Sequence, residues 1–271
     1  MPDVAALERL AVRVATEAAR LVVDERPDHL SAAATKSSPT DVVTVMDTRA
    51  EQLIRERLLQ ERPQDSILGE EGDDHAGDSE VTWVVDPIDG TVNYLYEIPA
   101  YAVSVAAVTG DPLVPGEWDV LAAAVADPCR GVVFHAHRGG GARLSTVEGD
   151  VVRTLSVGRV ASLAGALVGT GFGYTPARRR VQGELLLELL PQVRDIRRIG
   201  SAALDLCMVA SGQLDAFYEI GLNPWDLAGG WLVVAEAGGV VSGPGGGPPT
   251  DALTVAANPA LHLQLAALVD R

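Results

Sequence analysis

The stretch that decides the fold is VTWVVDPIDGTVNYLY, residues 81–96. Its first part, 81–86, is an almost wholly apolar run that ends in Asp86, which predicts a buried strand. The PIDG sequence that follows predicts a sharp turn, so Asp89 should lie close to Asp86 at the carboxyl end of the strand. Two adjacent carboxylates repel each other unless a cation neutralises them, and Mg²⁺ prefers carboxylate, water and phosphate oxygens. The segment therefore predicts a magnesium site, to which the carbonyl of Ile88 could add one oxygen.

The two residues after Asp89 suit the binding of an anion. Gly90 lets the backbone approach a ligand closely, and Thr91 begins a segment with helical character, whose free N–H groups can hold a phosphate. Metal-binding carboxylates and phosphate-binding amides thus occur within six residues. A structural turn is the alternative explanation of DPIDGT at this point.

Other acidic residues lie far from this segment in the sequence. They are Glu70 in LGEEG, Asp226 in NPWDLAGG, and Asp47. Spacing alone does not bring them to the site. Glu70 also fits an acidic loop in water, and Asp47 and Asp226 also fit helix N-caps.

The composition indicates an ordered, acidic globular chain. Hydrophobic residues make up 47% of the 271 residues and charged residues 21%, far from the composition of disordered proteins. The 21 basic and 37 acidic residues give a formal charge of −16, which argues against broad contact with nucleic acid or an anionic membrane. A protein of this charge that handles phosphate needs a local positive charge, such as bound metal.

The cysteines and the N-terminus favour the cytoplasm. Cys129 and Cys207 lack the spacing of zinc ligands and do not suggest a disulfide framework, so reduced thiols are expected. The sequence MPDVAALERL lacks the basic region of a secretory signal, and no apolar run reaches transmembrane length.

The hydrophobic pattern predicts two fused halves of different type. A stripe over 4–22 predicts an amphipathic helix covering a sheet, and Thr48 and Glu51 have the spacing of a capping box for a second helix. With strands at 101–108, 120–126 and 131–137, the first half, 1–142, is α+β and ends near the glycine cluster at 139–141. The second half, 143–271, is α/β, with strands at 166–170, 195–199, 214–219 and 252–257 between helices at 176–190, 201–211, 226–237 and 259–270.

Three segments carry a family resemblance. LGEEG, WVVDPIDGTVNYLYEIPAYAVS and YEIGLNPWDLAGGWLVVAEAGGVV occur in the order seen in the inositol monophosphatase family, and the chain resembles that family over roughly 4–260. The resemblance implies one compact unit with a layered α-β-α-β-α fold, often a homodimer. It also implies a magnesium-dependent phosphatase with two to three Mg²⁺ ions in each active site.

The resemblance assigns the metal ligands residue by residue. Glu70, Asp86 and the Ile88 carbonyl would bind a first ion, and Asp86, Asp89 and Asp226 a second. A third, weaker ion would contact Glu70. One metal would activate water and another would stabilise the departing alkoxide.

The resemblance also assigns the residues around the phosphate. The amides of Gly90 and Thr91 would hold it, and Lys36 lies in the family's mobile loop beside it. Thr91, oriented by Asp47, would help Glu70 deprotonate the attacking water.

The segment RRIGSAALDLCMVASGQLDAFYE resembles the family's substrate segment. By this resemblance Gly200, Ser201 and Ala202 approach the inositol ring, and Glu219 accepts hydrogen bonds from ring hydroxyls. A carboxylate suits a neutral polyol and disfavours an additional phosphate, although Glu219 also fits a surface position at a strand end. The implied substrate is inositol monophosphate.

Two alternatives stay open. One is a related phosphatase that acts on histidinol phosphate or fructose bisphosphate. The other is a regulatory role, in which the chain binds a protein partner in transcription complexes. Direct binding of nucleic acid is not expected from so acidic a chain.

Overall fold

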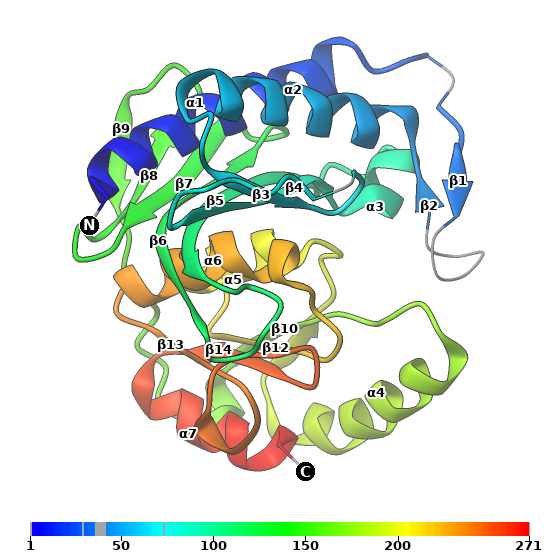
Figure 1. The fold of residues 1–271 in the computed structure, drawn as a ribbon. Helices are drawn as coiled ribbons and strands as arrows, with labels where there is room; N and C mark the ends of the chain where they lie inside the picture. Colours follow the sequence, from blue (N-terminus) through cyan, green and yellow to red (C-terminus); the bar gives the residue numbers. More distant parts are fainter. Residues whose placement is uncertain (1, 29, 36–41, 73, 271) are drawn as a thin grey trace.

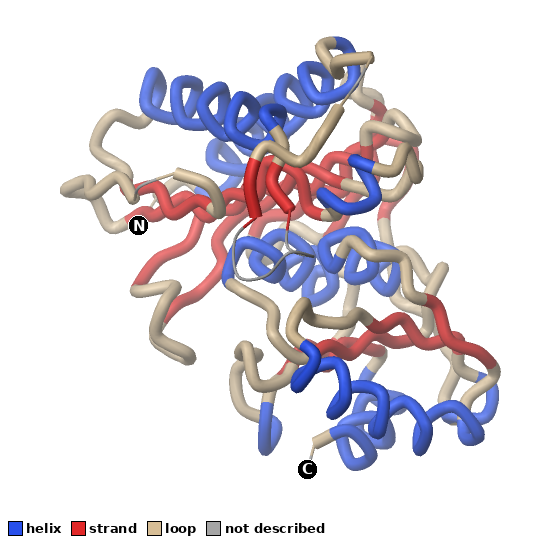
Figure 2. Tube along the Cα trace, turned by 90° about the vertical axis from the view of Figure 1, so that its right-hand side faces the viewer, coloured by secondary structure: helices blue, strands red, loops and turns tan. Residues whose placement is uncertain are grey.

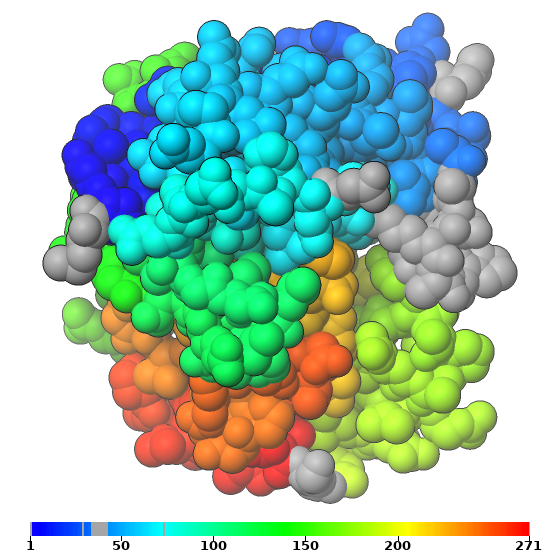
Figure 3. Space-filling view, in the orientation of Figure 1, coloured from blue at the N-terminus to red at the C-terminus, as the bar shows by residue number. Residues whose placement is uncertain are grey.

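Five layers of secondary structure are stacked in the computed structural model, which describes residues 2–28, 30–35, 42–72 and 74–270 (Figure 1). From top to bottom of Figure 1 the layers are a helix pair, a seven-stranded sheet, a second helix pair, a five-stranded sheet and a third helix pair. Figure 2 shows the same order from the side. In the space-filling view of Figure 3, the blue and cyan residues form the upper part and the orange and red residues the lower part. The expected α-β-α-β-α fold is confirmed.

The outer helices α1 (Val4–Asp24) and α2 (Val45–Glu61) cover one face of the seven-stranded sheet. The side chain of Asp3 caps α1 by accepting hydrogen bonds from the amides of Ala5 and Ala6. A row of fully buried small residues lets α1 approach the sheet closely, namely Ala11, Ala15, Ala18 and Ala19.

The first sheet has the strand order β3-β4-β5-β6-β7-β8-β9. Only the β3–β4 pair is parallel among these seven strands, and the other neighbours are antiparallel. The strand bounds are β3 Ser66–Gly69, β4 Val81–Asp89, β5 Ala102–Gly110, β6 Trp118–Asp127, β7 Val132–His137, β8 Ala142–Thr146 and β9 Val151–Thr154.

This sheet is buried on both faces. Alternate residues of β5 point to opposite sides, so Val103 and Val105 pack toward α1 and α2, whereas Ala102 and Ala106 pack toward the middle helices. Two separate hydrophobic cores result, one on each side of the sheet.

The expected turn after Asp86 does not form, because β4 continues through Asp89. Its pairing with β5 shifts register between Asp86 and Asp89. Pro87 has no N–H to donate to the ladder, so the strand is locally irregular there. The irregular segment, rather than a turn, brings the two carboxylates to the same end of the strand.

The second half is built around the sheet β11-β10-β12-β14-β13. Strand β10 pairs parallel with both β11 and β12, whereas β14 pairs antiparallel with both β12 and β13. The middle helices α5 (Ala202–Ala210) and α6 (Pro224–Glu236) lie above it, and α4 (Pro176–Leu189) and α7 (Pro259–Val269) lie below it (Figure 1). The strand bounds are β10 Leu167–Thr170, β11 Asp195–Arg197, β12 Ala216–Glu219, β13 Val240–Ser242 and β14 Thr254–Ala257.

The change from one sheet to the other comes later in the chain than the glycine cluster at 139–141. Strands β8 and β9 follow these glycines and still belong to the seven-stranded sheet. The remaining elements are the short helix α3 (Thr91–Leu95), the two-residue strands β1 (Ala34–Thr35) and β2 (Val42–Val43), and three 3₁₀ turns in the second half (Leu163–Gly165, Leu190–Gln192 and Pro244–Gly246).

The capping box expected from Thr48 and Glu51 is wrong. The N-cap of helix α2 is Thr44, four residues before the expected Thr48. The amide of Thr44 donates to Asp47 at 2.8 Å, and the amide of Met46 donates to the Thr44 hydroxyl oxygen at 3.2 Å. Both spacings satisfy the same sequence pattern, and the capping geometry selects the earlier one.

Within the described residues, none of the helices combines the length and the apolar character that a bilayer crossing needs.

Candidate active site

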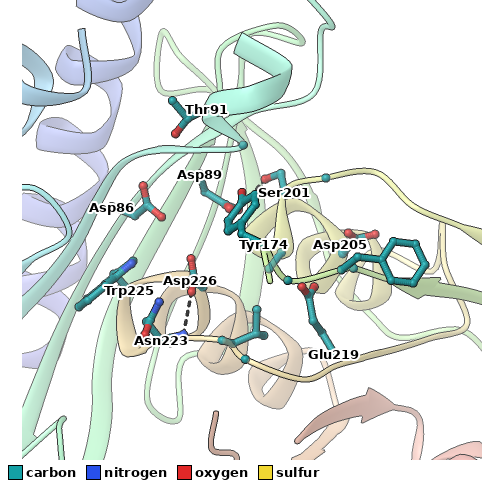
Figure 4. A pocket seen from close by; sticks show the side chains of 18 of the residues that line it. Asp86, Asp89, Thr91, Tyr174, Ser201, Asp205, Glu219, Asn223, Trp225 and Asp226 are labelled. Atoms are coloured by element: carbon teal, nitrogen blue, oxygen red, sulfur yellow. Dashed lines mark hydrogen bonds between the residues drawn. The ribbon is translucent and has the colours of Figure 1, made fainter. Parts of the chain in front are cut away.

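A cavity of about 410 Å³ lies where the end of β4 meets the N-termini of α5 and α6 and the loop after β10. Figure 4 shows its side chains. Of the site residues that were expected from the sequence and that the structure describes, all except Asp47 line it: Glu70, Asp86, Ile88, Asp89, Gly90, Thr91, Gly200, Ser201, Ala202, Glu219 and Asp226. The structure thus brings together residues that are up to 156 positions apart (226 − 70).

Three carboxylates converge in this cavity. Asp86 and Asp89 at the end of β4 and Asp226 on α6 each offer an oxygen, and these oxygens lie within 4.8 Å of one another. Asp86 is 1% exposed and Asp89 7% exposed. Buried acids so close together repel each other, and a divalent cation with a preference for oxygen ligands would relieve that repulsion.

Asp89 is held from the second half of the chain. Its Oδ2 atom accepts hydrogen bonds from the Ser201 hydroxyl at 2.6 Å and from the Ala203 amide at 2.7 Å, both at the start of α5. Burial raises the pKa of Asp89 to about 6 although these hydrogen bonds act in the opposite direction. Asp86 accepts a hydrogen bond from the amide of Ile88 at 3.0 Å.

Asp226 occupies the third position of α6 and not its N-cap. Its carboxylate accepts the amide N–H of Asn223 at 2.7 Å (dashed line in Figure 4), so it belongs to a capping box. Burial raises the pKa of Asp226 well above its usual range, and the neighbouring charges of Asp89 and Glu70 raise it further. Pro224 at the first turn fixes the start of the helix and so the position of this acid.

Glu70 borders the cavity from the loop after β3, and Glu51 on α2 holds that loop. The Glu51 carboxylate accepts hydrogen bonds from the amides of Glu71 and Gly72, each at 2.8 Å, and from Arg55 Nε at 2.8 Å. Glu51 is only 2% exposed. The sequence pattern indicated a capping box for Glu51 and not this role, since nothing in the local sequence links positions 51 and 71.

Thr91 and Asp47 are hydrogen-bonded across 44 positions of sequence. The Thr91 hydroxyl lies 3.0 Å from Asp47 Oδ1 and 3.0 Å from the carbonyl oxygen of Ile88, and it can donate to either. Asp47 is fully buried, and burial raises its pKa against the hydrogen bonds from Thr44 and Thr91. The Ile88 carbonyl, expected to bind metal, lies in the cavity wall.

Two glycines let the halves of the chain approach each other at the cavity. Gly90 has φ 100° and Gly200 has φ 94°, a conformation that side chains rarely adopt. A Cβ atom at Gly90 would lie 3.1 Å from the carbonyl oxygen of Gly200. Asn93 spans the same junction by donating to the carbonyls of Ala100 and Ile199 at 2.7 and 2.9 Å.

Glu219 lies at the end of β12, on the side of the cavity away from Asp86 (Figure 4). Burial and then the charge of Asp89 raise the pKa of Glu219 to about 8. Its carboxylate lies against Gly171, where any Cβ atom would collide with it.

The cavity wall contains further residues that the sequence analysis did not select, among them Tyr174, Arg178, Arg198, Asp205, Trp225 and Asp251. They lie in loops and on helix surfaces, where only the three-dimensional arrangement shows that they face one cavity. Lys36 lies outside the described residues.

The comparisons with known proteins agree with this geometry. The sequence profile of the inositol monophosphatase family matches residues 3–271. The inositol-1-monophosphatase of Mycobacterium leprae is 49% identical over 98% of this chain and 94% of its own length. The protein of Escherichia coli named Nus factor SuhB is 39% identical over 86% of this chain and 83% of its own length.

A solved structure extends the agreement to three dimensions. Mycobacterium tuberculosis SuhB is 45% identical, covers 97% of this chain and 95% of its own chain, and superposes with a TM-score of 0.79. The residues that match the family, 3–271, include both sheets and all the residues that line the acidic cavity. The chain therefore belongs to the inositol monophosphatase family, and it is a phosphatase.

Proposed function

We propose that this phosphatase hydrolyses inositol monophosphate to inositol and phosphate in a reaction that depends on Mg²⁺. The observation that supports this most directly is the set of carboxylate oxygens of Asp86, Asp89 and Asp226 within 4.8 Å. A further carboxyl group, that of Glu219, faces the same cavity from the opposite side. One end of the cavity thus suits a cation with its phosphate, and the other suits hydroxyl groups.

The donor set fits Mg²⁺. Asp86, Asp89 and Asp226 offer only oxygen, and no His or Cys belongs to the acidic group found within the described residues. Oxygen ligands favour Mg²⁺ over softer metals, and Mg²⁺ is commonly held by about one or two carboxylates together with water and phosphate. Glu70 would complete this set from the loop that Glu51 holds.

The metal, when bound, would supply positive charge that neutralises the phosphate and makes water more acidic. The chain's own residues would position the reacting groups. The amides of Gly90 and Thr91 would hold the phosphate. The Thr91 hydroxyl donates to Asp47 or Ile88 and keeps its lone pairs to accept a hydrogen bond from the attacking water. Glu70 would accept the proton of that water.

The proposed substrate is supported by Glu219 and by the names of relatives. The Mycobacterium leprae relative is named an inositol-1-monophosphatase. Glu219, at the far end of the cavity, can hydrogen-bond with the hydroxyls of a neutral ring in either protonation state, and it offers no positive charge to a second phosphate.

A phosphate-release assay tests this proposal. The panel contains inositol 1-phosphate, histidinol phosphate, fructose 1,6-bisphosphate and 4-nitrophenyl phosphate, each with Mg²⁺ and with EDTA. We expect the highest kcat/KM on inositol 1-phosphate and loss of turnover in EDTA. A preference for histidinol phosphate or the bisphosphate would show that the proposed substrate is wrong. Full turnover in EDTA would show that the reaction does not depend on a metal.

A second candidate function is supported by the relative named Nus factor SuhB. The chain would then bind a protein partner in transcription complexes in addition to its phosphatase activity. Binding of the purified chain to an RNA polymerase elongation complex, measured by interferometry, tests it. Asp226→Asn should bind as tightly as the unmodified chain if the two activities use separate surfaces.

A further inference from the structure

Asp205 is a buried carboxyl group that borders the cavity and that the roles proposed above do not use. It lies on the first turn of α5, which Ser201 caps, and it is 1% exposed. Its Oδ1 atom has no hydrogen-bond partner among the described residues, and it forms no ion pair with them. A carboxyl oxygen left in this state destabilises the fold by about 1–3 kcal/mol. Because Asp205 also lines the cavity, a ligand bound there can contact its carboxyl group.

The neighbours of Asp205 place it beside Glu219. The Asp205 Oδ1 atom lies 2.9 Å from the position of a Cβ atom built on Gly169, and the Glu219 carboxylate lies against Gly171. Gly169 lies in β10 opposite Phe217 of β12, and Gly171 directly follows the end of β10, beside the end of β12 where Glu219 lies. The segment Gly169-Thr170-Gly171 thus leaves room for two carboxyl groups, and Figure 4 shows both on the side of the pocket away from Asp86.

The charges around Asp205 restrict what it can bind. Burial raises the pKa of Asp205 well above its usual range, Glu219 and Asp89 raise it further, and Arg198 lowers it. A second phosphate would meet two acidic groups here. A divalent cation is also disfavoured, because within the described residues only Asp86, Asp89 and Asp226 form a group with metal-ligand spacing. A hydroxyl group can hydrogen-bond with a carboxyl group in either protonation state.

We propose that Asp205 is a substrate-binding residue which, together with Glu219, recognises two hydroxyl groups of a phosphorylated polyol at the end remote from its phosphate. This inference deepens the proposed function and rests on it. The substrate class is narrowed to phosphates of polyols with at least two free hydroxyls in that region. Phosphates without such hydroxyls can use the acidic end of the cavity but gain nothing from Asp205.

Asp205→Leu tests the proposal, because leucine has nearly the shape of aspartate and no polar atom. We expect kcat/KM on inositol 1-phosphate to fall about 5- to 100-fold, the effect of losing hydrogen bonds to a buried carboxyl group. Turnover of 4-nitrophenyl phosphate should stay within about twofold. The melting temperature should stay equal or rise, since an unsatisfied buried group has been removed. Asp205→Asn keeps the capacity of the side chain to form hydrogen bonds. This variant should retain most of the activity of the unmodified chain on inositol 1-phosphate.

Thr146→Val is the matched control. The Thr146 hydroxyl oxygen is also buried without a hydrogen-bond partner among the described residues, but it lies on β8, outside the cavity wall. This variant should change neither substrate's kinetics. If Asp205→Leu does not fold, Asp205→Ala gives the same comparison between the two substrates.

The outcomes separate this inference from the proposed function. Equal losses on both substrates, or no loss on inositol 1-phosphate, would overturn the role of Asp205. If the unmodified chain hydrolyses 4-nitrophenyl phosphate but not inositol 1-phosphate, the proposed substrate is wrong, and the comparison is made on glycerol and sugar phosphates. Failure to hydrolyse any polyol phosphate would overturn both.

Discussion

Two of the carboxylates proposed to bind metal, those of Asp89 and Asp226, also accept hydrogen bonds from the chain itself. Asp89 accepts two hydrogen bonds from the start of α5, and Asp226 accepts one from the start of its own helix. Each acid is thus held in place before any cation binds. An amide in either position would keep part of the hydrogen bonding and lose the charge.

We expect Asp89→Asn and Asp226→Asn to reduce kcat by at least about 10²-fold at saturating Mg²⁺. Each removes a charge that would hold the metal, and loss of metal stabilisation costs several kcal/mol in the barrier. Steady-state phosphate release measures this, with circular dichroism to verify the fold. Asp150→Asn, an exposed position in the β8–β9 turn, is the control. Near-normal turnover of Asp89→Asn or Asp226→Asn would show that the substituted residue is not a metal ligand.

Thr91→Ala should lower kcat by about 10²-fold and leave KM within about threefold. The hydroxyl is proposed to orient water, whereas the backbone amide that would hold phosphate remains in place. Thr91→Ser keeps the hydroxyl and should retain most of the activity. A change in KM alone would assign the Thr91 side chain to substrate binding.

At the scale of elements, the sequence predicted whether a segment forms a helix or a strand better than it predicted where that helix or strand begins and ends. The strong period of 4–22 and the apolar run at 81–86 correspond to α1 and most of β4. The continuation of β4 to Asp89 could not be foreseen, because Pro87 and Gly90 are typical of a turn and only pairing with β5 keeps the segment extended. Weakly apolar edge strands such as β9, exposed at every residue, carry no clear pattern.

The candidate site shows the same limit. DPIDGT placed Asp86 and Asp89 together from local sequence, whereas Asp226 joined them only through the family resemblance. Glu51 and Asp205 were not found, because their roles depend on contacts with residues far away in the sequence. A buried acid in a helix looks the same in sequence whether it faces a cavity or a neighbouring loop.

Glu51→Gln tests how α2 supports the loop that carries Glu70. The substitution replaces charge-assisted hydrogen bonds to the Glu71 and Gly72 amides with weaker ones. We expect a fall in stability of about 1–3 kcal/mol and a several-fold increase in the Mg²⁺ concentration needed for half-maximal activity. Glu56→Gln, exposed on the same helix, should change neither quantity. A lower melting temperature with unchanged Mg²⁺ dependence would limit Glu51 to a structural role.

At the scale of the whole molecule, one buried acid ties the N-terminal helix to the far part of the first sheet. Glu8 on α1 lies 2.7 Å from His135 Nδ1 and 2.5 Å from His137 Nδ1, and it accepts hydrogen bonds from Arg143 at 2.9 and 3.0 Å. Burial would raise the pKa of Glu8, but these hydrogen bonds outweigh it and lower the pKa to about 2. The contact joins residues 8 and 143, separated by nearly half the chain.

The lowered pKa makes Glu8 a source of acid sensitivity. Because the pKa is about 2 in the folded chain and 4.5 ordinarily, the carboxylate stabilises the fold above pH 4.5, and this contribution declines as the pH falls toward 2. Glu8→Gln should therefore reduce the free energy of unfolding by about 2–3 kcal/mol at pH 7 and by much less near pH 2. Urea unfolding at a series of pH values measures the difference. Glu17, on the same helix as Glu8, forms an exposed ion pair with Arg57 of α2, and Glu17→Gln should have a much smaller effect. A Glu8 effect that does not depend on pH would contradict this account.

The expectation of a homodimer stays a prediction at this scale, and light scattering on the purified chain tests it.

The two hydrogen bonds that the start of α5 donates to Asp89 also determine how the enzyme loses activity on heating. If the middle helices separate from the seven-stranded sheet, both hydrogen bonds break. The same separation moves Asp226 on α6 away from Asp86 on β4. Heat inactivation should therefore be an early event, in which catalysis stops while helices and strands still give their full circular dichroism signal. A divalent cation bound by all three acids would crosslink the seven-stranded sheet to α6. The temperature at which these layers separate would then rise with the concentration of the cation.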